Sequence, residues 1–231
     1  MKVFKAEDRY LTQISWLKSY HSFSFGEHYH PENKGWGNLR VINEDYIAPG
    51  GIFDTHPHRD MEIISYIAKG ELHHKDSQGN EYTINENEVQ RISAGTGILH
   101  SEHNTGEQET ILLQLWIKPK VKQTQPNYKQ IKLEKKERMN RLQLIASEDG
   151  SEGSIDIKQD AKIFASILDQ GKSLDYKIEY GKAWVQVLEG DLKVNDLELN
   201  SGDGLAIDGN EALNILAAAN SHFLLFDISS N

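Results

Sequence analysis

The sequence predicts an all-β protein built from two related units. Short stretches rich in Val, Ile, Leu, Phe and Tyr recur between clusters of Gly, Asn and Asp, and long stretches with the 3.6-residue period of an amphipathic helix are scarce. Two motifs of the first half also recur in the second half. The 231 residues are enough for one or two domains of about 100 to 150 residues each.

Eight segments have the composition of β-strands. In chain order they are 39–42, 61–68, 70–75, 88–93, 110–117, 183–188, 191–194 and 223–228. Residues 76–80 and 188–191 have the composition of turns, with Gly79 and Gly190 available for a positive φ. Each of these turns therefore predicts a β-hairpin.

Residues 118–153 differ in composition from the segments on either side. Pro119 and Pro126 interrupt them, charge rises, and 148–153 hold no apolar side chain. We therefore predict two domains, 1–125 and 126–231. The Lys-rich stretch 129–141 is the one candidate basic patch, and we interpret it as a solvated linker.

Two motifs recur across this boundary. Residues 184–192 resemble 64–72, because in both an apolar strand leads into Gly, an acidic residue and Leu. Residues 200–205 resemble 93–98 in the same way. The chain is therefore interpreted as a duplication whose two copies have diverged.

Composition excludes several classes of protein. The 25 Lys and Arg against 35 Asp and Glu give a net charge of −10, which argues against direct binding to nucleic acid or to an anionic membrane. No run reaches the roughly 18 apolar residues of a membrane span, and the charged first residues do not suit a signal peptide, so we expect a cytoplasmic protein. The absence of Cys excludes disulfides, thiolate zinc sites, iron–sulfur clusters and Cys nucleophiles.

The histidines suggest a metal site. Ten occur, and all but His222 lie between residues 21 and 103. Because side chains alternate along a strand, His56 and His58 share one face of a strand, and His100 and Glu102 share one face of another. Three imidazoles and a carboxylate suit Fe, Mn, Ni, Cu or Zn better than Ca or Mg. The sequence therefore predicts one transition-metal site at these four residues and none in the second half.

Other histidines fit the site less well. His28 and His30 form a second H-x-H pair, but in a loop-like setting without a matching H-x-E pair. His103 has the opposite strand parity to Glu102 and is expected to point off the site. His74 stays open as a supporting or pocket residue. We expect structural or exposed roles for His21, His73 and His222.

These residues resemble the motifs of the pirin family, within the cupin superfamily. Gly50-x5-His56-x-His58-x3-Glu62 is similar to the first cupin motif, and Gly97-x2-His100-x3-Asn104 is similar to the second. Segments 55–62, 74–80 and 93–102 resemble pirins more specifically. The likeness is dense from 21 to 117, and it is weaker in the second half, where 184–187 and 202–207 carry it.

The resemblance implies a bicupin of two jelly-roll-like β-barrels, with a metal in the amino-terminal barrel and a degenerate carboxy-terminal cupin. It implies His56, His58, His100 and Glu102 as metal ligands, and it ranks Glu102 above Glu62, which stays a reserve ligand or pocket carboxylate. Fe(II) is the first choice of metal, ahead of Cu, Ni, Mn and Zn.

The implied activity is that of an oxidoreductase similar to quercetin 2,3-dioxygenase. Such an enzyme opens the central ring of a flavonol with dioxygen and releases carbon monoxide, and Glu102 is the expected catalytic base. Two alternatives stay open: a non-catalytic, metal- and redox-sensing pirin that acts through a protein partner in regulation, and another small-molecule cupin reaction. We expect a monomer, and the sequence leaves the physiological substrate open.

Overall fold

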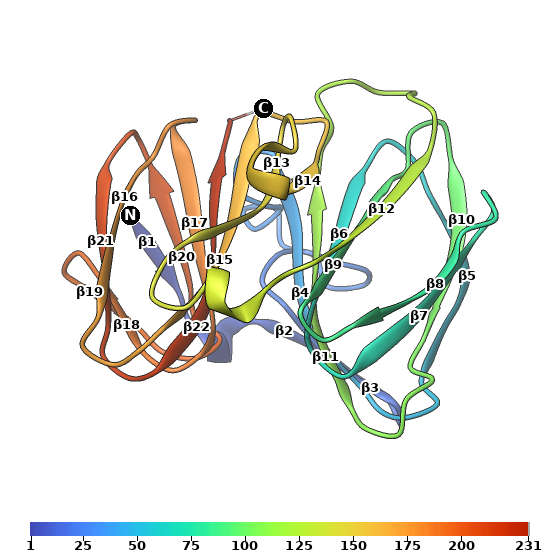
Figure 1. Ribbon diagram of the computed structural model, residues 1–231, viewed down its shortest axis with the longest axis horizontal. Helices are drawn as coiled ribbons and strands as arrows, with labels where there is room; N and C mark the ends of the chain where they lie inside the picture. Colours follow the sequence, from blue (N-terminus) through green and yellow to red (C-terminus); the bar gives the residue numbers. More distant parts are fainter. Residues whose placement is uncertain (231) are drawn as a thin grey trace.

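Four β-sheets make up the computed structural model, which describes residues 1–230. Two seven-stranded sheets lie side by side at the centre, and a four-stranded sheet covers the outer side of each (Figure 1). The predicted all-β class is confirmed. None of the helical turns in residues 1–230 is long and apolar enough to cross a membrane.

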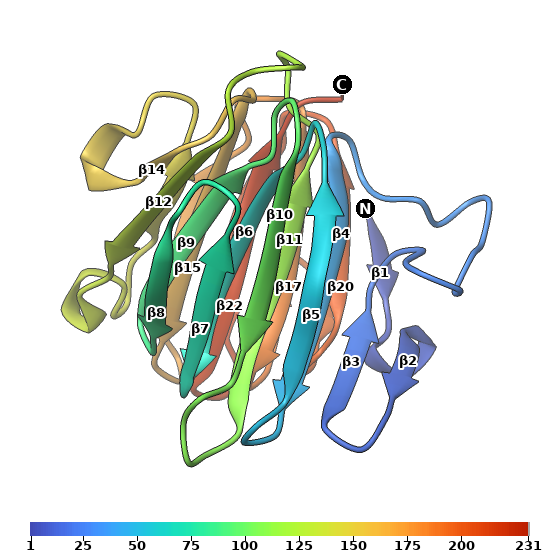
Figure 2. The ribbon, with the colours of Figure 1, turned by 90° about the vertical axis from the view of Figure 1, so that its right-hand side faces the viewer.

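The first half of the chain supplies one sheet of each kind. Its seven-stranded sheet contains, in spatial order, β12 (Asn127–Lys132), β9 (Glu88–Ser93), β6 (Glu62–Lys69), β11 (Thr110–Ile117), β4 (Leu39–Ile47), β3 (Leu17–His21) and β2 (Tyr10–Gln13). Its four-stranded sheet contains β5 (Ile52–His58), β10 (Ile98–His103), β7 (Glu71–Asp76) and β8 (Glu81–Asn85). This outer sheet faces the viewer in Figure 2.

The second half repeats the arrangement. Its seven-stranded sheet contains β1 (Lys2–Phe4), β20 (Gly204–Asp208), β17 (Lys182–Glu189), β22 (Ser221–Ile228), β15 (Ala161–Leu168), β13 (Gln143–Ser147) and β14 (Ile155–Asp156). Its four-stranded sheet contains β16 (Ser173–Lys177), β21 (Ala212–Ala217), β18 (Leu192–Val194) and β19 (Leu197–Leu199). The short 3-10 turns are η1 (Ala6–Asp8), η2 (Lys135–Glu137) and η3 (Ser151–Gly153).

One of the two predicted hairpins is confirmed and the other is wrong. β7 and β8 pair directly, and Asp76 closes their turn by accepting hydrogen bonds from the backbone N–H groups of Gln78 and Asn80. β17 and β18 belong to different sheets, so residues 188–191 connect the inner sheet to the outer one. Gly190 makes this crossing with φ 79°, and a Cβ there would lie 2.1 Å from the Asn220 carbonyl oxygen.

Gly70 makes the matching crossing between β6 and β7, with the same φ of 79°. A Cβ at Gly70 would lie 2.9 Å from the Thr110 hydroxyl. A positive φ and a tight neighbour both demand glycine at these equivalent points. The repeated motif therefore encodes the change of sheet, which a local turn signal does not distinguish from a hairpin.

The two halves exchange strands at their margins. β12 pairs with β9 of the first half, and β1 pairs with β20 of the second half. The predicted domain division between residues 125 and 126 stays a prediction. The prediction of a solvated linker at 129–141 is wrong, because β12 is a sheet strand and Arg138 is only 2% exposed.

The largest apolar cluster lies between the two seven-stranded sheets. Leu113 and Leu115 of β11 meet Trp184 of β17 and Phe226 of β22 in this cluster. Trp184 is fully buried, and its ring centroid lies 4.9 Å from that of Phe23 in the first half. Burial of apolar area at this interface therefore joins the halves.

Removing the Trp184 side chain is expected to destabilise the whole chain. Trp184→Ala leaves a cavity in the interface, and such a change costs about 3–5 kcal/mol of unfolding free energy. Tyr29→Ala, at a side chain that is 66% exposed, should change it by less than about 0.5 kcal/mol. Urea unfolding followed by fluorescence measures both. Equal effects of the two substitutions would contradict the assignment of the core to this interface.

A histidine in the same interface predicts a pH dependence. His222 Nε2 lies 2.7 Å from the Tyr66 hydroxyl, and burial, followed by the charges of Arg138 and Lys135, lowers the pKa of His222 to about 4. Because the ordinary pKa of histidine, which His222 has in the unfolded chain, is 6.5, the free energy of unfolding should fall as the pH drops from 6.5 to 4 and level off below. Thermal unfolding at pH 7 and pH 4.5 measures this loss of stability, which should be smaller for His222→Gln than for wild type. An identical loss of stability in the two proteins would refute the assignment of the pH dependence to His222.

Candidate metal centre

The pairing of β5 with β10 brings the predicted histidines together. The two strands run antiparallel, with His56 opposite His100 and Pro57 opposite Leu99. β5 is the edge strand of the outer sheet, which is where a proline without an N–H group is tolerated. The strands lie next to each other in Figure 2. A register shift follows His100, so that Glu102 pairs with Phe53.

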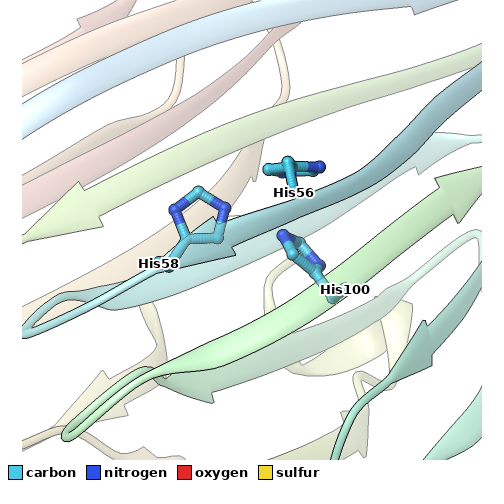
Figure 3. Close-up of side chains that lie close together, drawn as sticks. All are labelled: His56, His58 and His100. Carbon is cyan, nitrogen blue, oxygen red and sulfur yellow. The ribbon is translucent and has the colours of Figure 1, made fainter.

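Three imidazoles converge across these strands. The ring centroids of His56 and His100 are 4.4 Å apart, and that of His58 is 4.8 Å from each. One nitrogen from each ring lies within 4.8 Å of the others. Figure 3 shows His56 and His58 on one strand and His100 on the neighbouring strand. This is the spacing at which nitrogen atoms share one ion.

Two of these imidazoles, those of His58 and His100, are suited to bind a metal because their surroundings hold them neutral. Burial, and then the neighbouring histidines, lowers the pKa of His100 to about 2, and burial lowers the pKa of His58 to about 4. His100 is 1% exposed, and neither of its ring nitrogens has a hydrogen-bond partner among residues 1–230. Buried polar atoms are normally paired, so these two unpartnered nitrogens make His100 a candidate ligand. Neutral imidazole is the form that coordinates borderline divalent cations.

Glu102 lies in a second group of ligand atoms that also contains His100. It is 1% exposed. One of its carboxylate oxygens lies within 4.8 Å of a nitrogen on His100 and a nitrogen on His74, and this group is distinct from the three-histidine group. The side-chain amides of Gln90 and Gln114 donate one hydrogen bond to each of its oxygens, at 3.2 and 3.1 Å. Burial, and then the charge of Asp45, raises the pKa of Glu102 to about 7. The carboxyl is therefore oriented and able to hold a proton.

His74 supports this region from β7. It is fully buried, and its Nε2 lies 3.0 Å from a carboxylate oxygen of Asp76, while its Nδ1 has no partner in the described chain. Its ring stacks on Tyr128, with centroids 4.9 Å apart. A carboxylate that fixes the orientation of an imidazole beside a metal site is a common arrangement.

The other predicted carboxylate lies elsewhere. Glu62 accepts a hydrogen bond of 2.7 Å from the Ser93 hydroxyl and is in neither ligand group within residues 1–230. His28 and His30 are also outside both groups. His21 has a structural setting, since its ring nitrogens pair with Thr12 and Asn43, but it also lines the cavity described next.

A cavity of about 290 Å³ opens beside the histidines. His56, His58 and Glu102 line it, together with apolar and polar side chains that the sequence analysis missed: Phe25, Asp45, Gln114 and Trp116. The Trp116 ring lies 5.0 Å from that of His58. Side-chain alternation along residues 110–117 could have indicated two of them, because Gln114 and Trp116 occupy the face of the strand opposite Leu113 and Leu115. Such a volume and lining suit a small, flat ligand.

Comparison with known proteins places the chain in a family. Residues 4–117 match the family model described as Pirin, and residues 144–228 match that of the quercetinase C-terminal cupin domain. The chain is 38% identical over 226 residues to quercetin 2,3-dioxygenase of Escherichia coli, covering 97% of this chain and 96% of that protein. It is 35% identical over 214 residues to the pirin-like protein of Caulobacter vibrioides, covering 92% of each.

A solved structure agrees with these matches. The crystal structure of the bacterial pirin YhhW of Escherichia coli in complex with nickel(II) superposes with a TM-score of 0.94 at 36% identity, over 100% of this chain and 99% of that one. Two family models match the chain one after the other, and relatives match it along nearly their whole length. The chain, which has two cupin domains, therefore belongs to the pirin family.

Proposed function

We propose that this chain is a metal-dependent oxidoreductase that opens the ring of a flavonol such as quercetin with dioxygen. The observation that carries the proposal is the group of three converging imidazoles, His56, His58 and His100, beside a cavity of about 290 Å³ with aromatic walls. The relative from Escherichia coli named quercetin 2,3-dioxygenase supports the substrate class and the reaction.

The ligand set in this proposal is His56, His58, His100 and Glu102. The unpartnered nitrogens of His100 fit a transition ion, as does the choice of imidazole and carboxylate donors. Iron(II) is our first choice, followed by copper, nickel, manganese and zinc; a relative's structure with nickel(II) supports a divalent transition ion in this fold. When bound, such an ion supplies the Lewis acidity that lowers the pKa of a substrate hydroxyl.

The side chains of the cavity then have distinct tasks. Trp116 and Phe25 pack on a flat aromatic substrate and exclude water. Glu102 accepts the proton of the substrate hydroxyl, since its environment raises its affinity for a proton. Gln90 and Gln114 keep the Glu102 carboxyl in place through their amide N–H groups.

We expect one transition-metal ion per chain, lost when a ligand histidine is removed. His56→Ala and His100→Ala should each lower the metal content by about tenfold or more while circular dichroism shows the β fold retained. His103→Ala is the matched control, because His103 lies on β10 outside both ligand groups. Elemental analysis that finds wild-type metal in both alanine variants, or two tightly bound ions per chain, would refute the assignment.

We expect Glu102→Gln to keep part of the metal and to lose activity. A carbamoyl group cannot accept the proton, so turnover of quercetin should fall by about 10²-fold or more. Glu62→Gln serves as the control, since Glu62 is an equally buried carboxylate away from the cavity. Oxygen uptake and carbon monoxide release measure turnover.

Equal turnover by wild-type protein, Glu102→Gln and metal-stripped protein would show that the activity belongs to something else. Metal binding without turnover of any phenolic compound would instead favour the regulatory, partner-binding alternative.

A further inference from the structure

A second cleft, of about 480 Å³, lies between the two halves of the molecule. The first half contributes residues of β4, β6 and β11, and the second half contributes residues of β15, β17 and β22. The segment after β12 closes one side. Figure 1 shows this segment passing from one half to the other. The cleft shares no lining residue with the cavity beside the histidines. It is therefore a separate feature that the proposed reaction does not use.

One of the two buried charged side chains that line this cleft has no counter-charge in the described chain. Four of the six charged side chains are exposed, two of each sign: Lys69, Lys135, Glu86 and Glu189. Of the two buried ones, Glu44 is neutralised by Arg9, whose Nη1 lies 2.6 Å from its carboxylate. The remaining one is Arg138, which is 2% exposed and forms no ion pair within residues 1–230.

The Arg138 guanidinium has unused hydrogen-bond donors. Its Nη2 donates to the Asn87 side-chain oxygen, whereas Nε and Nη1 are buried without a partner in the described chain. Its polar neighbours, the Asn87 amide and the Tyr66 hydroxyl, carry no charge. A buried cation without a counter-charge is costly, so such a group is normally paired.

The other buried arginine shows what a purely structural role looks like. Arg91 is 1% exposed, and all three of its guanidinium nitrogens donate hydrogen bonds. Two of these nitrogens bond to Asp156 of the second half, one to its carboxylate and one to its carbonyl. The same chain thus satisfies one buried arginine completely, and it leaves two nitrogens of the other, which lines the cleft, without a partner in the described chain.

The surroundings of Arg138 favour an anion. The charges that act on His222, in the same cleft, are those of Arg138 and Lys135, and both lower its pKa. Ile111, Leu113 and Leu188 add apolar surface to the walls. An amphipathic ligand with one negative charge matches this combination better than a hydrated inorganic anion.

We propose that this interdomain cleft binds a small organic carboxylate, with the carboxylate on the Arg138 guanidinium and the apolar body against Ile111, Leu113 and Leu188. Planar carboxylates pair with guanidinium groups through charge-assisted hydrogen bonds. The ligand would touch both halves, so it would also strengthen the interface.

Isothermal titration calorimetry of the full chain with benzoate tests the proposal. Benzamide, of the same shape without the charge, should not bind, and inorganic phosphate should bind more weakly than benzoate. Asn87→Asp places a carboxylate against Arg138 Nη2 without a change in shape, and Asp tolerates the φ of 65° at this position. This variant should lower benzoate affinity by about tenfold or more, because the cation is then paired internally.

Two further variants make the result specific. Arg138→Met should abolish benzoate binding, and Arg141→Gln, which removes an exposed charge three residues along the same segment, should leave it unchanged. Wild-type protein that binds no benzoate, or binds phosphate in preference, would overturn the proposal. Benzoate affinity that survives both Asn87→Asp and Arg138→Met would also overturn it, because the ligand would then sit elsewhere. None of these measurements depends on turnover of a flavonol.

Discussion

The antiparallel register of β5 and β10 is the constraint on which the candidate site depends. With His56 opposite His100, both H-x-H nitrogens and the histidine of the H-x-E pair reach the same point. A slip of one residue would turn every side chain of a strand to the other face of the sheet. The register is held from the other side as well, because β10 also pairs with β7, where His100 lies opposite Asp76.

Burial gives the assembled residues their chemistry. Removing water disfavours charged forms, so it lowers the pKa of His100 to about 2 and raises that of Glu102 to about 7. The same environment thus keeps lone pairs free on the imidazoles and a proton within reach of the carboxyl. The amides of Gln90 and Gln114 hold the carboxyl in place, and their hydrogen bonds lower the pKa of Glu102 by less than burial and the charge of Asp45 raise it.

Local composition predicted the all-β class and eight of the strands, and side-chain alternation placed His56 and His58 on one face of their strand. These local signals do not predict which distant segments pair. Strand β1 pairs with β20 some two hundred residues later, and its three residues carry no pattern that names this partner. The turn at Gly190 has the residues of a hairpin, yet the packing of two sheets makes it a crossing. The uncompensated charge of Arg138 follows only from burial, which a Lys-rich segment does not suggest.

The second half of the chain acts on the site through the far side of the same strands. On β11, Leu113 and Leu115 pack against the second half, while Gln114 between them donates to Glu102. β9 is built in the same way, since Val89 lies in the interface cluster and Gln90 reaches Glu102. Because a strand is rigid over three residues, packing that fixes one face also fixes the other. The second cupin domain therefore holds in position the amides that orient the Glu102 carboxyl of the first domain.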